Sequence, residues 1–388
     1  MTTEKHRARR TTWRILAGGR SLLGWLSVVC VAFPFLDLNV VNVEDPASKR
    51  IIERYDILET KWIDLGQWKK RTNDSGTLAW NTSYLMDSYL EVYGTTHQRK
   101  YLEKFVALAD PVTEQTDEKR GLGDYLGRAR TGWGSVAYSK GRVVWLVHTA
   151  MITFPLVKFA MIVGANSDLS DLAARAKKYR LVTEGALAEF DGDWRDDPVT
   201  REGYYVFETG HPLDGAVVNP ETPLPINMQL AAGRTLIALW ELTATPIYRQ
   251  KAEALARTFK NHLGLSPSGA YSWTYWFGRG LSLSKAPEDM SHGSIDVSFA
   301  VVAARNSIVF TKTDLSLFAQ TFFENLGSAT ARGKPIDIGT QSLWSALSSS
   351  SCQVYQALYP MLVSHDGSPD PRILLGLSEL AESTKECS

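Results

Sequence analysis

The sequence predicts a mainly α-helical chain whose repeated helical hairpins form a toroid, an (α/α) barrel of five or six hairpins with long loops at one end. An apolar helix, a short polar break and an amphipathic helix recur several times along the 388 residues. The repeats fall at irregular intervals of roughly 60 to 80 residues, which favours an inner and an outer ring over an open solenoid of constant period. Long stretches rich in Gly, Pro, Asn and Asp separate the hairpins, so we expect functional loops there.

Four hairpins are expected from hydrophobic periodicity. They cover residues 78–110, 142–190, 225–263 and 293–326, with polar breaks near Gly94, Gly164, Thr243 and Thr311. Further helices at 51–68 and 352–380 bring the total close to six. The second helix of the first hairpin shows the stripe of an outer helix, since Tyr101, Phe105 and Leu108 share one face. The long loops are expected at 191–225, 266–290 and 332–341.

The apolar stretch 143–163 is long enough to resemble a membrane span. It contains His148, Pro155 and Lys158. The imidazole and the ammonium group are costly in lipid, so the stretch is predicted to be a helix buried inside the toroid.

The N-terminus predicts export. Basic residues from Lys5 to Arg20 precede the uncharged run 21–36, a pattern typical of a secretion signal or an uncleaved signal anchor. We therefore expect residues 1–40 to be a signal segment and residues 41–388 to be one toroid domain. The protein would be periplasmic or extracellular, with membrane attachment through 21–36 if the signal is retained. Cys30 lies in this segment, and a disulfide between Cys352 and Cys387 is an open alternative.

Composition and motifs exclude several classes of function. Lys plus Arg equals Asp plus Glu at 42 each, so the chain has no nucleic-acid footprint in its net charge. Neither H-E-x-x-H nor C-x-x-C occurs, and His148, His211 and His292 belong to separate hairpins. No P-loop, dinucleotide-binding fingerprint or G-x-S-x-G is present. We expect neither a metal nor a cofactor.

The segment 271–296 is the densest in candidate functional groups. Its aromatic residues alternate with a period of two, which places Tyr271, Trp273 and Tyr275 on one face of an extended segment. His292 and Asp296 are four residues apart, so a helix beginning near Gly293 would let them hydrogen-bond and would orient the imidazole as an acid or base. The structural alternative is that Asp289 or Ser291 caps this helix. The other ionisable groups of the segment are Arg279, Lys285 and Glu288.

A second cluster lies at 204–227. Glu208 and His211 stand in a stretch that Gly210 and Pro212 keep out of a helix. Asn227 opens the next apolar helix, where a capping role is the alternative. In the middle of another helix, His148 is expected to be a hydrogen-bonded core residue, with a substrate-binding role as the alternative.

Three segments, 224–256, 269–276 (GAYSWTYW) and 287–303 (PEDMSHGSIDVSFAVVA), resemble (α/α)-toroid enzymes acting on polysaccharides, especially alginate- and glucuronan-type lyases and uronyl epimerase-like toroids. The resemblance implies abstraction of the C5 proton of a uronic acid, with Tyr271 or Tyr275 as acid and base. His292 or His211 would be a partner base, and Asn227, Arg279 or Glu208 would neutralise the carboxylate. Trp133, Trp273 and Trp276 would stack on sugars, with a core role equally open. The substrate-binding candidates are Asn227, Arg279, Trp273, Trp276, Glu288, Asp289, Asp296 and His148.

Two other functions remain open. An inverting glycoside hydrolase needs two carboxyl groups about 6.5 to 9.5 Å apart, and Glu208, Glu221, Glu288 and Asp289 are the candidates. A non-catalytic polysaccharide-binding component of an export system is the other alternative. All three functions require that the stretches 271–296 and 208–227 meet at a shared cavity.

Overall fold

The computed structural model describes residues 45–66, 72–213, 221–277 and 286–387. The chain divides into a unit Met1–Phe33 and a unit Pro34–Ser388. The expected signal segment, with Cys30, lies outside the described residues, as do Arg279 and Lys285. The helices and strands of the described residues all belong to the second unit.

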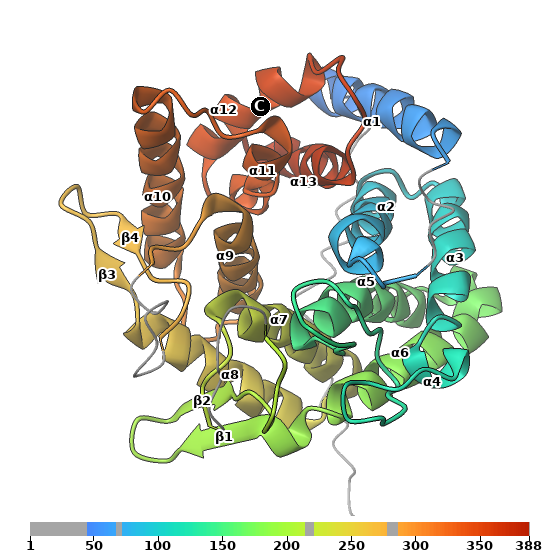
Figure 1. Ribbon diagram of the computed structural model, residues 1–388. Helices are drawn as coiled ribbons and strands as arrows, with labels where there is room; N and C mark the ends of the chain where they lie inside the picture. The colour runs from blue at the N-terminus through green and yellow to red at the C-terminus, as the bar shows by residue number, and fades with distance from the viewer. Residues whose placement is uncertain (1–44, 67–71, 214–220, 278–285, 388) are drawn as a thin grey trace, which may run out of the picture. The chain divides into compact units, whose positions relative to one another are not determined.

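Six helical elements form an inner ring (Figure 1). Each packs on the next in chain order, and the last packs on the first, so the ring is closed. The expected toroid is therefore confirmed in its complete six-hairpin form. The inner elements are α2 (Ser83–Thr96), α5 (Leu146–Ala165), α7 (Ile226–Thr243), α9 (Met290–Arg305), the 3-10 helix η6 (Ser345–Ser349) with α11 (Ile338–Ser342) before it, and α13 (Pro371–Cys387).

An outer helix covers each inner element. Helices α3 (Arg99–Thr113), α6 (Ala173–Ala188), α8 (Pro246–Asn261) and α10 (Lys312–Ala331) pack on α2, α5, α7 and α9. Helix α12 (Cys352–Val363) packs on η6 and α13, and α1 (Pro46–Asp64) packs on α13. Because α1 precedes the first inner helix in the sequence but covers the last one, the two ends of the unit close the ring together.

The inner and outer helices bury different amounts of their surface. The length and composition of helix α5 would suit a membrane span, but 83% of its most apolar 18-residue stretch is buried inside the protein. Its Lys158 donates to Asp87 on α2 at 2.5 Å. The prediction of a core helix is confirmed. The outer helix α8 buries one stripe, which includes Ala252, Leu255 and Phe259.

The boundaries differ from the expected ones at the fourth hairpin. Helix α9 begins at Met290 and ends at Arg305, and α10 begins at Lys312. Thr311 is the N-cap of α10, and it forms a capping box with Asp314. The polar residues at 311–314 thus mark a helix start rather than the break itself.

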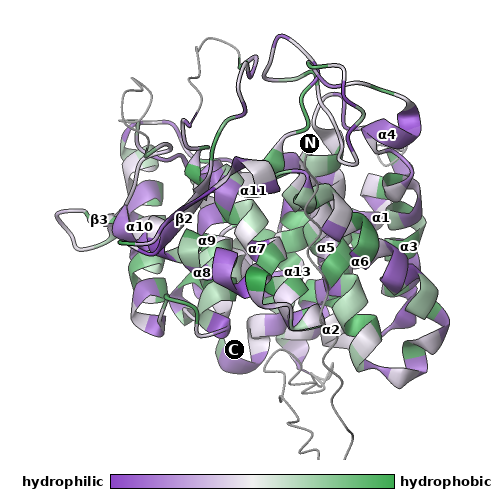
Figure 2. Cartoon of the chain, turned by 90° about the horizontal axis from the view of Figure 1, so that it is seen from below, coloured by the Kyte–Doolittle hydropathy of each residue, from purple (hydrophilic) through white to green (hydrophobic). Residues whose placement is uncertain are grey.

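All connections from an outer to the next inner helix lie at one end, because each hairpin reverses the chain direction. These connections are the long ones, and they gather on one side in Figure 2. This loop end contains the N-termini of the inner helices. It carries the expected loops and a further one at 114–145 that was not predicted; α4 (Asp117–Arg120) lies in it. Arg142 ties this loop down through Asp117 and Asp74.

Two short antiparallel hairpins belong to the loops. Strands β1 (Trp194–Asp197) and β2 (Glu202–Tyr205) pair before α7, and β3 (Gly264–Leu265) and β4 (Tyr271–Ser272) pair before α9. The remaining elements are η2 (Leu78–Thr82), η3 (Ser167–Leu172) and η4 (Asp191–Asp193). A disulfide joins Cys352 at the start of α12 to Cys387 at the end of α13, which confirms that pairing.

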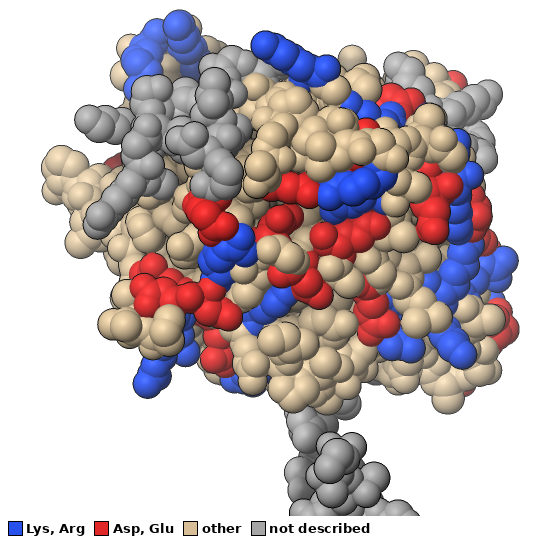
Figure 3. Space-filling view, turned by 60° about the horizontal axis from the view of Figure 1, so that its bottom comes forward, with Lys and Arg blue, Asp and Glu red and all other residues tan. Residues whose placement is uncertain are grey.

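Charge is mixed on the visible surface. On the face turned forward in Figure 3, Lys and Arg side chains alternate with Asp and Glu side chains, and neither sign forms a large patch. This face therefore offers no continuous field to an anionic polymer.

Two glycines within helices allow the effect of close helix packing on stability to be separated from the effect of helix propensity. A Cβ at Gly233 would lie 2.5 Å from the Phe299 ring, whereas a Cβ at Gly185 would meet nothing within 4 Å. We expect Gly185→Ala to raise the free energy of unfolding by about 0.5 to 1 kcal/mol through helix propensity. Gly233→Ala should lower it by about 1 to 3 kcal/mol, because α7 and α9 must separate. Urea denaturation of both variants measures the difference; equal effects would contradict the close approach of α7 and α9.

Candidate functional site at the loop end

The two predicted stretches lie side by side at the loop end. The backbone N–H of Ile226 donates to the carbonyl of Tyr275 at 3.1 Å. The Trp276 indole donates to the carbonyl of Pro223, and the Trp276 and Phe207 rings are 5.5 Å apart. Their placement at one end is as expected. The cavity of about 30 Å³ at this end is lined by the second stretch and by no residue of 271–296, so it is not the shared cavity that was expected.

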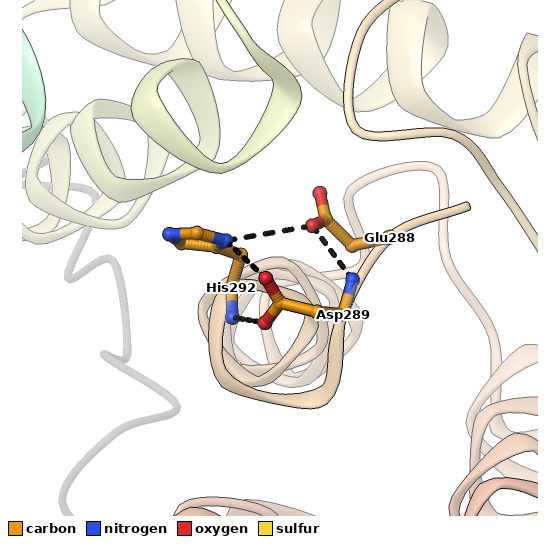
Figure 4. A group of neighbouring side chains, drawn as sticks. All are labelled: Glu288, Asp289 and His292. Atoms are coloured by element: carbon orange, nitrogen blue, oxygen red, sulfur yellow. Dashed lines mark hydrogen bonds and ion pairs between the residues drawn. The ribbon is translucent and has the colours of Figure 1, made fainter. Parts of the chain in front are cut away.

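Glu288, Asp289 and His292 form a compact group at the start of α9 (Figure 4). Asp289 is the N-cap and accepts from the backbone N–H of Ser291 and of His292. Its other oxygen lies 2.7 Å from Nδ1 of His292. Glu288 Oε1 accepts from the Asp289 backbone at 3.0 Å and lies 3.7 Å from the same Nδ1. Asp289 therefore both caps α9 and orients the imidazole of His292.

The two neighbouring carboxyl groups are held in opposite protonation states. Burial raises the pKa of Glu288 to about 9, and the charge of Asp296 adds to the effect. Burial acts in the same direction on Asp289, but the hydrogen bonds from His292 and Ser291 outweigh it and hold the pKa well below its usual range. Burial would lower the pKa of His292, yet the bond to Asp289 and the nearby negative charge raise it.

The expected hydrogen bond between His292 and Asp296 is wrong. Asp296 is fully buried, and its Oδ2 accepts from the Trp273 indole at 2.8 Å. His292 turns to Asp289 instead, because the N-cap carboxylate is nearer to the first turn of the helix. Burial raises the pKa of Asp296 well above its ordinary value, and its Oδ1 has no hydrogen-bond partner. Asp296 is therefore a core residue, and it affects the site by helping to raise the pKa of Glu288.

The alternation of aromatic residues does not place the three on one functional face. Tyr275 comes beside His292, with 5.3 Å between the ring centroids, because residues 273–275 pair with 286–288. Tyr271 points to the outer helix α10, where its hydroxyl donates to Asp314 at 2.5 Å. The rings of Tyr271 and Trp273 both contact Phe318 on α10, whereas the Tyr275 ring lies against His292. Of the two alternatives, Tyr271 or Tyr275, only Tyr275 lies beside His292.

The tryptophans expected to stack on sugars are core residues. Trp133 is 0% and Trp276 1% exposed, and their indoles donate to the carbonyls of Val112 and Pro223. Trp273 is 8% exposed, and its indole is used by Asp296. Their ring faces are covered by protein, which excludes the stacking role and leaves the core alternative.

Glu208 is held by residues that the sequence did not single out. Arg128 makes two hydrogen bonds to its carboxylate and also binds Asp124, and the hydroxyl of Tyr125 donates to it at 3.2 Å. The bonds from Arg128 lower the pKa of Glu208. The frequent Gly, Asp, Arg and Tyr residues at 121–134 were the only feature of the sequence that could have indicated a functional loop there.

A small cavity of about 30 Å³ lies beside Glu208, between the loops before α5 and α7. Asp193, another residue missed from the sequence, lines it, and burial together with the charge of Glu208 raises the pKa of Asp193 to about 6. His211 lies within 4.9 Å of both the Trp145 and the Phe207 ring, measured between centroids. Burial lowers its pKa to about 4, and its Nδ1 has no partner.

The other candidates have structural surroundings. His148 is 1% exposed, its Nδ1 accepts from the side-chain amide of Asn73 at 3.1 Å, and burial lowers its pKa to about 3. Its core role is thus favoured over substrate binding. Asn227 does not cap α7, whose N-cap is Pro225; it is buried, and its Oδ1 has no partner. Glu221 pairs on the surface with Arg195.

Glu288, Asp289 and His292 also have ligand atoms within 4.8 Å of one another, as a metal site would require. Their mutual hydrogen bonds and the capping of α9 account for this arrangement. We assign no metal to it.

No protein-family model and no curated protein matches the sequence. Among solved structures, the chain is similar to an inactive variant of an alpha-1,6-mannanase of Salegentibacter sp. in complex with alpha-1,6-mannotetrose. The TM-score is 0.50 at 11% identity, over 88% of this chain and 98% of that one. A family 76 glycoside hydrolase from a bovine Bacteroides thetaiotaomicron strain has a TM-score of 0.45 at 11% identity, over 78% and 68%. At such identity, the first likeness shows a shared toroid fold. It gives no support to lyase or epimerase chemistry.

The raised pKa of Glu288 predicts how stability changes with pH. A carboxyl whose pKa is higher in the folded state stabilises the fold below its unfolded value of 4.5, and this contribution is lost as the pH rises through about 9. Glu288→Gln removes the titration. We expect its stability relative to the natural chain to be about 1 to 3 kcal/mol greater at pH 9 than at pH 5. Denaturant unfolding at both values measures this.

Glu103→Gln is the matched control, since Glu103 lies exposed on α3. Its stability relative to the natural chain should not change between the two pH values. If Glu288→Gln behaves like this control, the buried, protonated state of Glu288 is refuted.

Proposed function

We propose that the chain is a polysaccharide-processing enzyme and, more specifically, a glycoside hydrolase acting at the loop end. The observation that carries the proposal is a cavity bordered by two carboxyl groups, Asp193 and Glu208, whose pKa values are displaced in opposite directions. The similarity to a toroid hydrolase supports this reaction above the lyase or epimerase. This similarity supports the proposal but does not establish it, because proteins with the same fold can catalyse different reactions.

The two carboxyl groups suit the two roles of glycoside hydrolysis. Asp193, with a pKa of about 6, retains its proton in mildly acidic solution and would donate it to the leaving oxygen. Glu208 stays ionised because Arg128 holds it, and it would act as the base. Tyr125 and Arg130, which line the same cavity, would fix the orientation of Glu208 and of the sugar.

The size of the cavity fits the water that an inverting mechanism needs. About 30 Å³ of space accommodates one or two water molecules. A water held there beside Glu208 would attack the anomeric carbon of a sugar bound above it. Glu288 and Asp289 are less suited to this pair, since their nearest ligand atoms lie within 4.8 Å.

The lyase or epimerase is the second candidate, and one observation favours it. Tyr275 lies beside His292, and Asp289 orients that imidazole through Nδ1 and leaves Nε2 for a proton transfer. This pair would abstract the C5 proton of a uronic acid, as the resemblance implies. Burial raises the pKa of Tyr275, which opposes its use as a base near neutral pH.

We also propose export, from the basic and apolar pattern of residues 5–36. The disulfide between Cys352 and Cys387 supports it, because disulfides persist in oxidising compartments. Fractionation of cells that make the full chain, with and without residues 1–36, tests this; equal cytoplasmic recovery would refute it.

Release of reducing ends from a panel of neutral and uronic-acid polysaccharides, including an α-1,6-linked mannan, tests hydrolysis by the purified chain. We expect Asp193→Asn and Glu208→Gln each to lower kcat/KM about 100-fold or more. Because Asp193 must be protonated, kcat/KM of the natural chain should fall as the pH rises through about 6. Asp196→Asn, in the same hairpin, is the control and should keep full activity.

The same incubations distinguish elimination from hydrolysis. If ultraviolet absorbance from an unsaturated uronide appears, and Tyr275→Phe or His292→Gln abolishes it while Asp193→Asn does not, the second candidate replaces the first. If the natural chain binds a polymer and never cleaves or epimerises it, both are wrong, and the protein is a binding component.

A further inference from the structure

A larger cavity opens at the end of the toroid opposite to the loops. Its volume is about 230 Å³, and side chains from all six inner elements line it. Most of them come from the second halves of α2, α5, α7, α9 and α13, and the others include residues of η6. We call it the axial cavity. Arg305 and Glu382 remain 36% and 46% exposed at its lining, so the cavity reaches solvent.

Carboxyl groups outnumber cations in the axial cavity. Its lining holds two cations, Lys158 and Arg305, and five carboxyl groups, which are Asp87, Glu91, Glu241, Glu379 and Glu382. Lys158 pairs with Asp87 and Glu91, and Arg305 pairs with Glu382. Glu241 and Glu379 remain without an ion-pair partner among the described residues.

Two buried polar groups of the lining lack hydrogen-bond partners. Oε1 of Glu241 has none, although the residue is only 8% exposed, and Oγ1 of Thr95 has none at 2% exposure. Glu241 otherwise interacts with Asn306, and Glu379 accepts from the hydroxyl of Ser345 at 2.5 Å. Buried polar atoms are normally paired, so these two unpaired atoms show that the protein's own groups do not satisfy all the polar atoms of this lining.

Helix dipoles add to the negative potential. Since the inner helices are parallel, their C-terminal ends converge on the axial cavity and bring partial negative charge with them. A cation entering the cavity would meet these ends together with Glu241 and Glu379.

We propose that the axial cavity binds a small organic cation through an ammonium group, with Glu241 and Glu379 as its counter-ions. The apolar part of the lining would contact the carbon skeleton; it comprises Leu90, Phe154, Met161, Ile162, Val301 and Val302. The volume lies below that of sites for drug-sized ligands, so a short aliphatic amine fits better than an oligosaccharide. The carboxyl groups do not form a three-ligand set of metal-binding spacing within the described residues, which disfavours a bare metal ion.

Binding should release protons. Burial raises the pKa of both Glu241 and Glu379 to about 8, so both are mostly protonated at pH 7. An ammonium group stabilises the ionised carboxylates and expels their protons, so affinity should rise with pH up to about 9. The charged groups that act on Glu241 and Glu379 are Asp87, Glu91, Lys158, Arg305 and Glu382 of the lining and the buried Arg234 behind it.

Isothermal titration calorimetry of the full chain with putrescine tests the proposal. We expect saturable binding at one site per chain and proton release at pH 7 that diminishes by pH 9, measured in buffers of different ionisation enthalpy. Glu241→Gln and Glu379→Gln should each weaken binding tenfold or more. The two substitutions keep side-chain size, and circular dichroism would confirm that the variants fold. Glu103→Gln on α3 is the control, with unchanged binding.

Three results would overturn the proposal. They are the absence of putrescine binding, equal binding of the neutral analogue 1,4-butanediol, and binding of Ca²⁺ that depends on the same two glutamates in place of the amine. Asp193 does not line the axial cavity, so Asp193→Asn should leave putrescine binding unchanged. The amine-binding proposal can therefore be tested independently of the proposed hydrolysis.

Discussion

The packing of α13 between α1 and α2 is the constraint on which the rest of this structure depends. This packing joins α13, the last inner helix, to α2, the first inner helix. It also places α1, which precedes α2 in the sequence, over α13. An open row of hairpins would leave the apolar faces of α2 and α13 in water. Closure buries both, and the disulfide between α12 and α13 fixes the C-terminal hairpin to which α1 is attached.

Closure makes the two ends of the toroid chemically different. All inner helices run in one direction, so their N-termini and the long loops lie at one end and their C-termini at the other. At the loop end, Asp289 is an N-cap whose carboxylate is stabilised in its charged form. At the opposite end, Glu241 and Glu379 lie near the negative ends of helices and retain their protons because they are buried. Asp289 is therefore ionised at the loop end, whereas Glu241 and Glu379 are neutral at the opposite end.

Both ends contain acids that burial forces into unusual protonation states, but the surroundings differ. At the loop end, Arg128 and Arg130 pair with Glu208 and keep it ionised, while burial and the charge of Glu208 raise the pKa of Asp193 to about 6. In the axial cavity, Lys158 and Arg305 are already engaged by other carboxylates. The first arrangement is suited to moving a proton, and the second is suited to holding a cation.

The hydrophobic periodicity of the sequence determined the helical hairpins, the buried character of α5 and the fold class, because burial of one helix face is a local property that repeats along the chain. It also located Glu208, His211, Glu288, Asp289 and His292 at one end. The partners of these residues were decided only by tertiary structure. His292 binds Asp289 rather than Asp296, and Tyr271 turns to α10. Arg128 reaches Glu208 from another loop, about 80 residues away in the chain, and Asp193 lines the cavity beside Glu208 from the start of the same loop. Spacing along a helix predicts which groups can meet, but desolvation and contacts between distant loops decide which ones do.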